Sequence, residues 1–216
     1  MSAPGSVPVV AAVVIAAGAS SRMGRPKALL PLRGRTFVAR IAAAARAGGA
    51  STVLVVVGPP HGEAVRARLP EGVRATWNAD PTRGMLSSVQ VGIAALEEDV
   101  DAALVWPVDT PLVWISTVRR ILGAGTARDG HDVTAVRDAA RGRLVVPTTD
   151  QGGGHPVLIG RRFFDEIAAL PLDGAGGLRG LMRAHASDVE RLAVADPGVR
   201  ADVDTPEDYQ RLVLRG

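Results

Sequence analysis

The sequence contains no cysteine among its 216 residues. Disulfide bonds, thiolate metal sites and cysteine nucleophiles are therefore excluded. Aromatic residues make up only 3% of the chain, so few side chains can stack on nucleic-acid bases. Nor does charge of one sign dominate, because 25 basic residues are scattered among 22 acidic ones. These shortages argue against a nucleic-acid-binding protein and predict a core of Val, Leu, Ile and Ala.

Hydrophobic runs long enough to cross a bilayer are also missing. The apolar run at residues 7–17 is too short for a membrane span, and no Lys or Arg precedes it as in a secretory signal. We therefore predict no membrane segment and a cytoplasmic location. The length suits one domain, and we predict a single domain over residues 1–216 with residues 1–8 as a flexible tail.

Short apolar runs that alternate with helix-like stretches are present throughout the first half. Val9–Ala17 is rich in β-branched residues and alanine, the pattern of a strand buried on both faces of a parallel sheet. This alternation predicts an α/β fold with a doubly wound sheet and right-handed crossovers. After Leu112 the rhythm is less regular, which favours mixed strand pairing there. The predicted strands are Val9–Ala17, Thr52–Val57, Val73–Trp77, Ala102–Trp106, Val133–Val136 and Pro156–Ile159, and the predicted helices are Thr36–Ala47, His61–Leu69, Met85–Leu96, one ending at Leu122, Arg161–Ala169, Leu178–Ala184 and one from Thr205.

A loop of small residues, AAGASSRMGRPK, follows the first predicted strand at residues 16–27. Its glycines let backbone N–H groups converge on an anion, and Arg22 and Lys27 add positive charge. The spacing matches neither a P-loop nor a G-x-G-x-x-G turn. The chain has 24 arginines and one lysine, which is Lys27. Because lysine is a compact point charge, its presence here favours a phosphate-binding loop over an ordinary turn.

Acidic residues stand at two later positions that suit a metal ion. Asp109 follows a predicted buried strand, at the edge where such sheets bind ligands. Mg²⁺ prefers carboxylate and phosphate oxygens, so one or two aspartates can hold it with a bound phosphate. Asp202 and Asp204 form a second acidic pair just before the helix predicted from Thr205. For these residues, a turn or a helix cap is the alternative interpretation.

Polar residues also gather just before and at the start of the helix predicted at residues 85–96. Asn78 is followed by Gly84, Ser87 and Ser88, and free N–H groups and hydroxyls at a helix N-terminus can bind the edge of a base. Plain capping of the helix is the alternative. Further along, His155 stands in a glycine-rich loop before a proline, where a lone histidine is more often structural.

Taken in their order along the chain, the motifs resemble those of the MobA-like nucleotidyltransferases. Among these, the molybdenum cofactor cytidylyltransferases are the most similar in pattern. The first loop resembles the family signature A-A-G-x-S-x-R-M-G-x-x-K. The segments G-M-x-x-S, the one around Asp109, G-H-P-V and D-x-D-T-P-E-D-Y follow along the chain in the order expected of the family. The resemblance covers nearly the whole chain. It implies a three-layer α/β/α, Rossmann-like fold with a mostly parallel sheet and a mixed C-terminal part.

The resemblance also implies a role for each motif. The catalytic residues would be Arg22, Lys27 and Asp109, and the acceptor would contact His155. Mg²⁺ would be held by Asp109 together with Asp202 or Asp204, and the choice between these two stays open. The nucleotide would contact Ala16, Ala17, Gly18, Ser20, Arg22, Lys27, Asn78, Gly84, Ser87 and Ser88. In such proteins an alanine at the position of Ala17 goes with CTP, whereas a glycine goes with GTP.

We therefore predict an enzyme that transfers a nucleoside monophosphate from an NTP, in first place CTP, to the terminal phosphate of molybdopterin or the molybdenum cofactor. The cofactor would be Mg²⁺, the products would include pyrophosphate, and a molybdoenzyme or its chaperone would be a transient partner. Alternatives within this class are a GTP-using guanylyltransferase and transfer to a sugar, polyol or phospholactate phosphate. Outside it, the alternatives are a nucleotide-binding regulator without turnover and an NAD-dependent oxidoreductase, against which the missing G-x-G-x-x-G argues.

Overall fold

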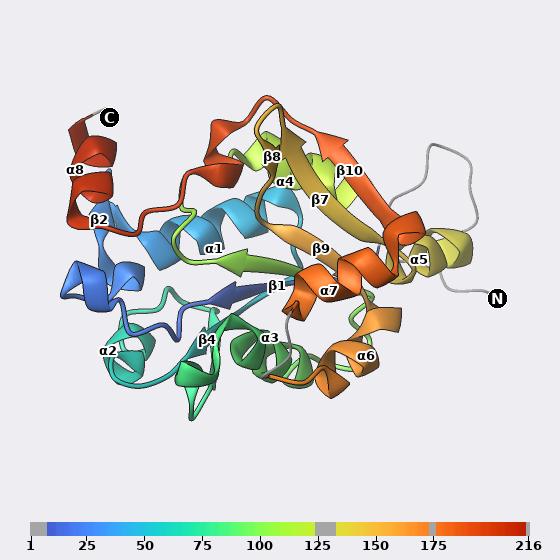
Figure 1. The fold of residues 1–216 in the computed structure, drawn as a ribbon, viewed down its shortest axis with the longest axis horizontal. Helices are drawn as coiled ribbons and strands as arrows, with labels where there is room; N and C mark the ends of the chain where they lie inside the picture. Colours follow the sequence, from blue (N-terminus) through green and yellow to red (C-terminus); the bar gives the residue numbers. More distant parts are fainter. Residues whose placement is uncertain (1–7, 124–132, 173–175, 215–216) are drawn as a thin grey trace.

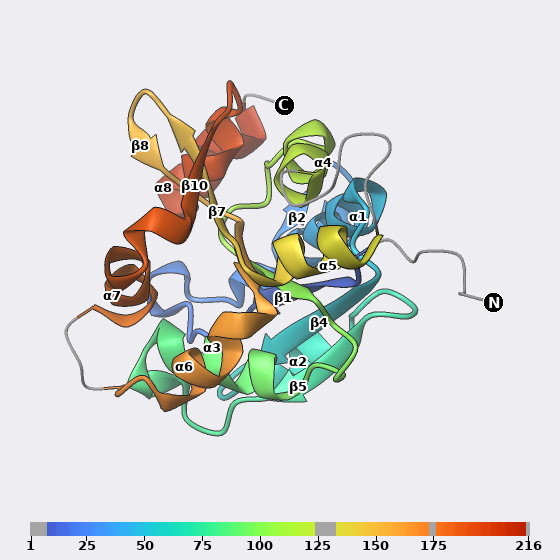
Figure 2. The same ribbon diagram turned by 90° about the vertical axis from the view of Figure 1, so that its right-hand side faces the viewer.

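The computed structural model describes residues 8–123, 133–172 and 176–214. Eight strands form one sheet in the order β10-β7-β9-β6-β1-β4-β5, with β8 paired to β7. Helices cover both faces of this sheet, which gives three layers (Figure 1, Figure 2). The strands of the sheet are β1 (Val10–Ile15), β4 (Thr52–Val57), β5 (Arg74–Trp77), β6 (Ala102–Pro107), β7 (Leu144–Thr149), β8 (Gly152–Gly153), β9 (Val157–Gly160) and β10 (Val189–Ala193), while β2 (Pro31–Leu32) and β3 (Arg35–Thr36) pair separately.

Two hydrophobic cores lie on the opposite faces of the sheet. α1 and α4 contribute to one core, and α3, α6 and α7 contribute to the other. Across the described ranges, no helix is both long enough and apolar enough to cross a membrane. The helices are α1 (Phe37–Gly48), α2 (Gly62–Arg66), α3 (Met85–Ala94), α4 (Ile115–Gly123), α5 (Val133–Arg141), α6 (Phe164–Ala169), α7 (Gly177–Ala184) and α8 (Pro206–Leu214).

The first half of the chain forms the parallel part of the sheet. β1 pairs in parallel with both β4 and β6, and every residue of β1 is buried. Its side chains alternate between the cores, since Val14 belongs to one and Val13 to the other. The parallel arrangement brings the carboxyl ends of β1 and β6 to one edge. The loop that follows β1 and the aspartate that follows β6 therefore start side by side.

The second half of the chain forms the mixed part. β9 is antiparallel to both β6 and β7, and β10 is parallel to β7 at the sheet edge. The predicted α/β/α fold with a mostly parallel sheet and a mixed C-terminal part is confirmed. Of the predicted tail, residues 1–7 lie outside the described residues.

The strand predicted at Val133–Val136 is wrong, because this segment begins helix α5. The helix places Arg137 and Arg141, four residues apart, on one face. There both guanidinium groups donate to the fully buried carboxylate of Asp101, with Nε–O distances of 2.8 and 2.7 Å. This contact with a residue distant in sequence favours a helix over the strand suggested by local composition. Strands β7 and β10 were absent from the prediction.

Candidate active site

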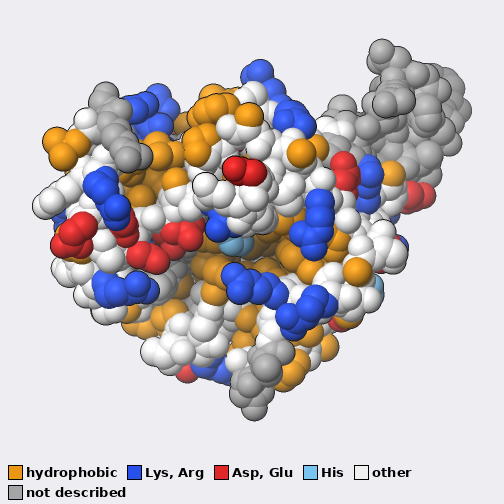
Figure 3. Space-filling view, turned by 45° about the horizontal axis from the view of Figure 1, so that its top comes forward, with side chains coloured by type: hydrophobic (Ala, Val, Ile, Leu, Met, Phe, Trp, Pro, Cys, Tyr) orange, Lys and Arg blue, Asp and Glu red, His pale blue; other side chains and the backbone are white. Residues whose placement is uncertain are grey.

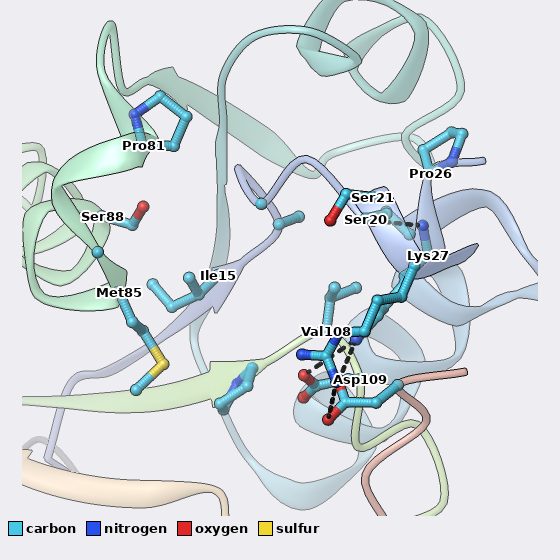
Figure 4. A pocket seen from close by; sticks show the side chains of 17 residues that line it. Ile15, Ser20, Ser21, Pro26, Lys27, Pro81, Met85, Ser88, Val108 and Asp109 are labelled. Atoms are coloured by element: carbon cyan, nitrogen blue, oxygen red, sulfur yellow. Dashed lines mark hydrogen bonds and ion pairs between the residues drawn. The ribbon is translucent and has the colours of Figure 1, made fainter. Parts of the chain in front are cut away.

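The loop after β1 bends back on itself at the edge of the sheet. Ser20 has a left-handed backbone with φ of 52°, and Gly24 has one with φ of 65°. The Ser20 hydroxyl accepts a hydrogen bond of 3.1 Å from the main-chain N–H of Lys27, and its carbonyl accepts one of 2.9 Å from Met23. These bonds hold the loop in a shape that directs the Lys27 side chain toward Asp109 (Figure 4).

A cavity of about 260 Å³ opens between this loop, the end of β6 and the start of α3. Pro81 and Met85 lie on the side of the cavity opposite Lys27 (Figure 4). The two sides leave between them a space bordered by cations on one side and by apolar and hydroxyl groups on the other. Of the predicted site residues, the cavity is lined by Ala16, Gly18, Ser20, Arg22, Lys27, Gly84, Ser88, Asp109 and Asp204.

Two carboxylates approach the ammonium group of Lys27 from distant parts of the chain. The Asp204 Oδ1 lies 2.5 Å from Nζ, and the Asp109 Oδ2 lies 3.7 Å from it. The two segments are joined by the main chain as well, because the Asp109 carbonyl accepts a hydrogen bond of 2.9 Å from Val203. Arg22 comes within 3.8 Å of Asp204, but its side chain is 71% exposed whereas that of Lys27 is 13% exposed. Lys27 thus lies deep in the cavity and Arg22 lies at its rim.

The capping of α8 leaves the Asp204 carboxylate available to Lys27. The Thr205 hydroxyl accepts a hydrogen bond of 3.2 Å from the Asp208 N–H, and the Asp208 carboxylate accepts bonds from the N–H groups of Asp204 and Thr205. Thr205 and Asp208 therefore cap the helix reciprocally. Asp202, by contrast, does not line the cavity and borders a separate hollow with Asp208 and Arg211.

The crowding of carboxylates changes their acidity. Burial raises the pKa of Asp109, Lys27 opposes this effect, and Asp204 adds to it. Burial also raises the pKa of Asp202, and the charges of Asp109 and Asp204 raise it further. A second cation close to these groups would relieve the repulsion between them.

The donor set fits a divalent cation that is held jointly with a ligand. Asp109 and Asp204 offer carboxylate oxygens, which are hard ligands, and both carboxylates lie next to the ammonium group of Lys27. Within the described part of the chain, no group of three or more His, Asp or Glu side chains is placed to hold a metal ion. Because Mg²⁺ is commonly held by one or two carboxylates together with substrate phosphates, two aspartates are sufficient.

The polar residues before α3 divide between structural and cavity-facing positions. The buried Asn78 amide donates hydrogen bonds of 2.9 Å to the hydroxyls of both Ser87 and Ser88. The Ser87 hydroxyl in turn donates to the Gly84 carbonyl at 2.8 Å. Asn78 and Ser87 therefore hold the start of α3 and do not line the cavity, whereas Ser88 does. Ala17 is likewise buried and outside the lining.

His155 lies outside this cavity and lines a second, adjoining one. Its main-chain N–H donates a hydrogen bond of 2.7 Å to the Val199 carbonyl. Burial lowers the pKa of His155, Asp109 acts in the opposite direction, and Arg179 lowers the pKa further. The lowered pKa favours the neutral form of His155, and the pKa responds to charged groups of both cavities, Asp109 in the first and Arg179 in the second.

Sequence reasoning missed the residues that complete the walls. Pro81 and Met85 face Lys27 across the first cavity, and their apolar character gave no chemical signal. Arg179 and Arg183 line the second cavity from α7. Their spacing of four residues within a predicted helix was a usable signal, because such residues share one helix face.

Comparison with known proteins gives a consistent family. The model of the MobA-like NTP transferase domain matches residues 12–189. The nicotine blue oxidoreductase of Paenarthrobacter nicotinovorans is 35% identical over 96% of this chain and 98% of its own length. The 2-C-methyl-D-erythritol 4-phosphate cytidylyltransferase of Streptomyces avermitilis is 35% identical over an aligned region that covers 68% of this chain and 62% of the relative.

Solved structures agree with these sequence relatives. The crystal structure of Rv0371c from Mycobacterium tuberculosis H37Rv superposes with a TM-score of 0.79 at 31% identity, covering 97% of this chain and 99% of that one. A second structure of Rv0371c is a complex with manganese, and it superposes with a TM-score of 0.75 at 30% identity over 97% of this chain and 100% of that one. With the loop after β1 and the aspartates after β6 and before α8 around one cavity, the chain belongs to the MobA-like NTP transferase family and is a nucleotidyltransferase of that type.

Proposed function

We propose that the protein transfers CMP from CTP to the terminal phosphate of a small-molecule acceptor, with molybdopterin or the molybdenum cofactor as the acceptor and pyrophosphate as the leaving group. The observation that carries this proposal is the position of Lys27. The only lysine in the sequence lies deep in a cavity with an anion-suited loop on one side and two aspartates on the other.

The chemistry is an in-line displacement at the α-phosphorus of the nucleotide. An oxygen of the acceptor phosphate forms a new P–O bond, and the bond from the α-phosphorus to the bridging oxygen of the β-phosphate breaks. A phosphate monoester has a second pKa near ~6, so it attacks as a dianion without a general base. Lys27 and Arg22 bind and orient the phosphates and stabilise the charge of the departing pyrophosphate.

We propose Mg²⁺ as the metal, held by Asp109 and Asp204 with phosphate oxygens completing its coordination. When bound there, the ion neutralises phosphate charge and orients the reacting groups. Asp204 is preferred to Asp202 because it shares the cavity with Asp109. The manganese complex of Rv0371c supports a divalent cation in a relative of this fold.

CTP is proposed from the resemblance of the first loop to the cytidylyltransferases, and a cytidylyltransferase among the relatives supports it. Since Ala17 does not line the cavity, any influence it has on the base would pass through the backbone of the loop.

Pyrophosphate release measured with each of the four NTPs, with and without the pterin acceptor and with Mg²⁺, tests this function. We expect release with CTP and the acceptor together, and only background release when either is omitted. Release that is equal with GTP would overturn the choice of base. Absence of release with every NTP and acceptor would overturn the proposed reaction.

A second candidate function follows from the similarity to nicotine blue oxidoreductase, which extends over almost the full length of both chains. The relative is named an oxidoreductase, so the similarity would admit an electron-transfer reaction in this chain, for which NADH and NADPH are the reductants we would test. Oxidation of NADH or NADPH followed at their absorbance maximum, in the presence of an aromatic electron acceptor, separates the two functions. Steady oxidation without pyrophosphate release from CTP would favour the oxidoreductase.

A further inference from the structure

A second cavity of about 780 Å³ adjoins the cavity that contains Lys27. The side chain of Met85, at the start of α3, lines both cavities. His155 lines the second cavity, and the charge of Asp109, which lines the first, raises the pKa of His155. A molecule bound in the second cavity can therefore reach the site at which the nucleotide is expected to react.

The floor of the second cavity is apolar. Val105 of β6, Val146 of β7 and Val157 of β9 supply it from three neighbouring strands, and Leu178 and Met182 of α7 continue it. These side chains belong to or pack against one of the two hydrophobic cores, so the floor is a rigid part of the fold. Figure 3 shows orange hydrophobic side chains at the bottom of a hollow bordered by blue Lys or Arg side chains.

Three arginines line the same cavity: Arg179 and Arg183 from α7, and Arg191 from β10. Among the described residues that line this cavity there is no aspartate or glutamate. In the ranges that the structure describes, none of the three guanidinium groups forms an ion pair or a hydrogen bond with the protein. Their positive charge therefore favours an anionic ligand.

His155 offers a further polar group to the same ligand. Its Nδ1 is buried, and within the described residues it has no hydrogen-bond partner. A buried ring nitrogen without a partner is costly unless a ligand supplies one. Among the described residues that line this cavity, His155 and the three arginines are the only ones whose side chains carry polar groups. A ligand rich in hydroxyl groups would leave most of those groups unsatisfied against the valine floor.

Resting on the proposed function, we propose that the acceptor is an amphipathic molecule with an apolar or flat ring body on this floor and a second anionic group, separate from the reacting phosphate, bound by Arg183 and Arg191. Phosphorylated sugars and polyols are disfavoured as acceptors, because they present hydroxyls where the protein presents methyl groups.

Binding of anilinonaphthalene sulfonate, which has an aromatic body and one sulfonate, tests the proposal without any enzymatic turnover. Fluorescence titration of the full chain should show one site, with the probe displaced by naphthalene disulfonate and retained in equal concentrations of sorbitol phosphate or inorganic phosphate. The double variant Arg183→Ala/Arg191→Ala should weaken probe binding roughly tenfold. Both arginines are exposed, so the variant should keep the wild-type thermal midpoint.

Arg68→Ala is the matched control, because this exposed arginine lies outside the cavity and only donates to the Ala64 carbonyl. Probe affinity unchanged by the double variant, or displacement by sorbitol phosphate, would overturn the proposal. The proposed function can fail separately. Probe binding lost in the double variant without pyrophosphate release from any NTP would uphold the cavity and reject the transferase. Turnover of CTP with an acceptor KM unchanged in the double variant would uphold the transferase and reject the proposed role of the second cavity.

Discussion

Lys27 and Arg22 carry the same charge but occupy different surroundings. Lys27 is enclosed between the carboxylates of Asp109 and Asp204, while Arg22 stays largely in solvent at the rim. Electrostatic interactions are stronger where water is excluded, so equal charges do not have equal effects on bound phosphates.

We expect Lys27→Ala to lower the rate of pyrophosphate release by about 100-fold to 1,000-fold, the size seen when one preorganised charge or donor is removed from an active site. Arg22→Ala, as the matched variant, should lower it by roughly tenfold. Steady-state kinetics of both variants at saturating CTP and Mg²⁺ measure the difference. Equal losses in the two variants would show that burial of the charge is unimportant.

We expect the ionised carboxylate of Asp109 to destabilise the folded state. Its pKa is raised by burial, with Lys27 opposing and Asp204 adding to this effect. A carboxyl group with a raised pKa stabilises the folded state fully below its ordinary pKa of about 3.8, and this stabilisation is lost as the pH rises through the raised value. At pH 7 Asp109→Asn should therefore raise Tm by about 2 °C while pyrophosphate release falls at least ~100-fold.

Asp208 is the matched control with the opposite sign. Hydrogen bonds from the Thr205 N–H and hydroxyl and from the Asp204 N–H lower the pKa of Asp208 to about 2. Its stabilisation is present above the ordinary pKa of about 3.8 and is lost as the pH falls toward 2. Asp208→Asn should thus lower Tm at pH 7. Circular dichroism melts of both variants at pH 7 and pH 5 test the pair, and a lower Tm for Asp109→Asn would contradict the prediction.

At the level of elements, the position of α3 depends on a residue without a side chain. A Cβ atom built on Gly92 would come within 2.4 Å of the Val13 Cγ1 and 2.9 Å of the Val56 Cγ2. α3 therefore lies directly on β1 and β4, and this contact sets the distance from Ser88 and Met85 to the loop after β1. In contrast, a Cβ on Gly180 of α7 would meet nothing within 4 Å.

We expect Gly92→Ala to destabilise the protein by about 2 kcal/mol, because the core must shift to admit the methyl group. Gly180→Ala should stabilise it by about 0.5 to 1 kcal/mol, since alanine is the better residue inside a helix. Urea denaturation followed by circular dichroism gives both values. A Gly92→Ala variant as stable as the wild type would mean that α3 can move away from the sheet easily.

Three of the strands that the sequence predicted have an unmixed apolar pattern. β1, β4 and β6 are buried on both faces, so they appear as continuous apolar runs. β10 is a half-exposed edge strand with the sequence VERLA, and β7 contains Pro147, so neither has such a run. The start of α5, at residues 133–136, was predicted as a strand. The contact of Arg137 with Asp101, which lies 36 residues earlier in the chain, cannot be seen in local composition.

The whole molecule decides which motif residues meet. Sequence order indicated that the loop after β1 and Asp109 would lie at the same edge of the sheet, and the parallel pairing of β1 with β6 places them there. Sequence could not indicate the direction of individual side chains, so Asn78, Ser87 and Ala17 were predicted to contact the nucleotide although they do not line the cavity. Nor could it indicate that antiparallel β9 would separate β6 from β7 and carry the floor of a second cavity.

Because the first cavity joins the loop after β1 to the segment before α8, nucleotide binding should stabilise the entire fold. We expect CTP with Mg²⁺ at about 100 times its Kd to contribute about 2.7 kcal/mol, which corresponds to a Tm rise of several degrees. Excess EDTA should remove most of this rise, and Lys27→Ala should abolish it. Differential scanning fluorimetry with CTP, Mg²⁺ and EDTA measures these effects. An identical rise for CTP in EDTA would exclude a metal from nucleotide binding.

The solitary lysine has a consequence for chemical labelling. With Lys27 as the sole ε-amine in the sequence, an amine-selective acylating reagent can modify one side chain, and that side chain lies in the first cavity. Intact mass spectrometry can therefore count occupancy of the cavity directly, once the α-amine at the chain start is distinguished by peptide mapping. A ligand that fills the cavity should protect the Lys27 amine from acylation, so the corresponding mass increase should be lost. This loss can be used to screen nucleotides and metals for binding.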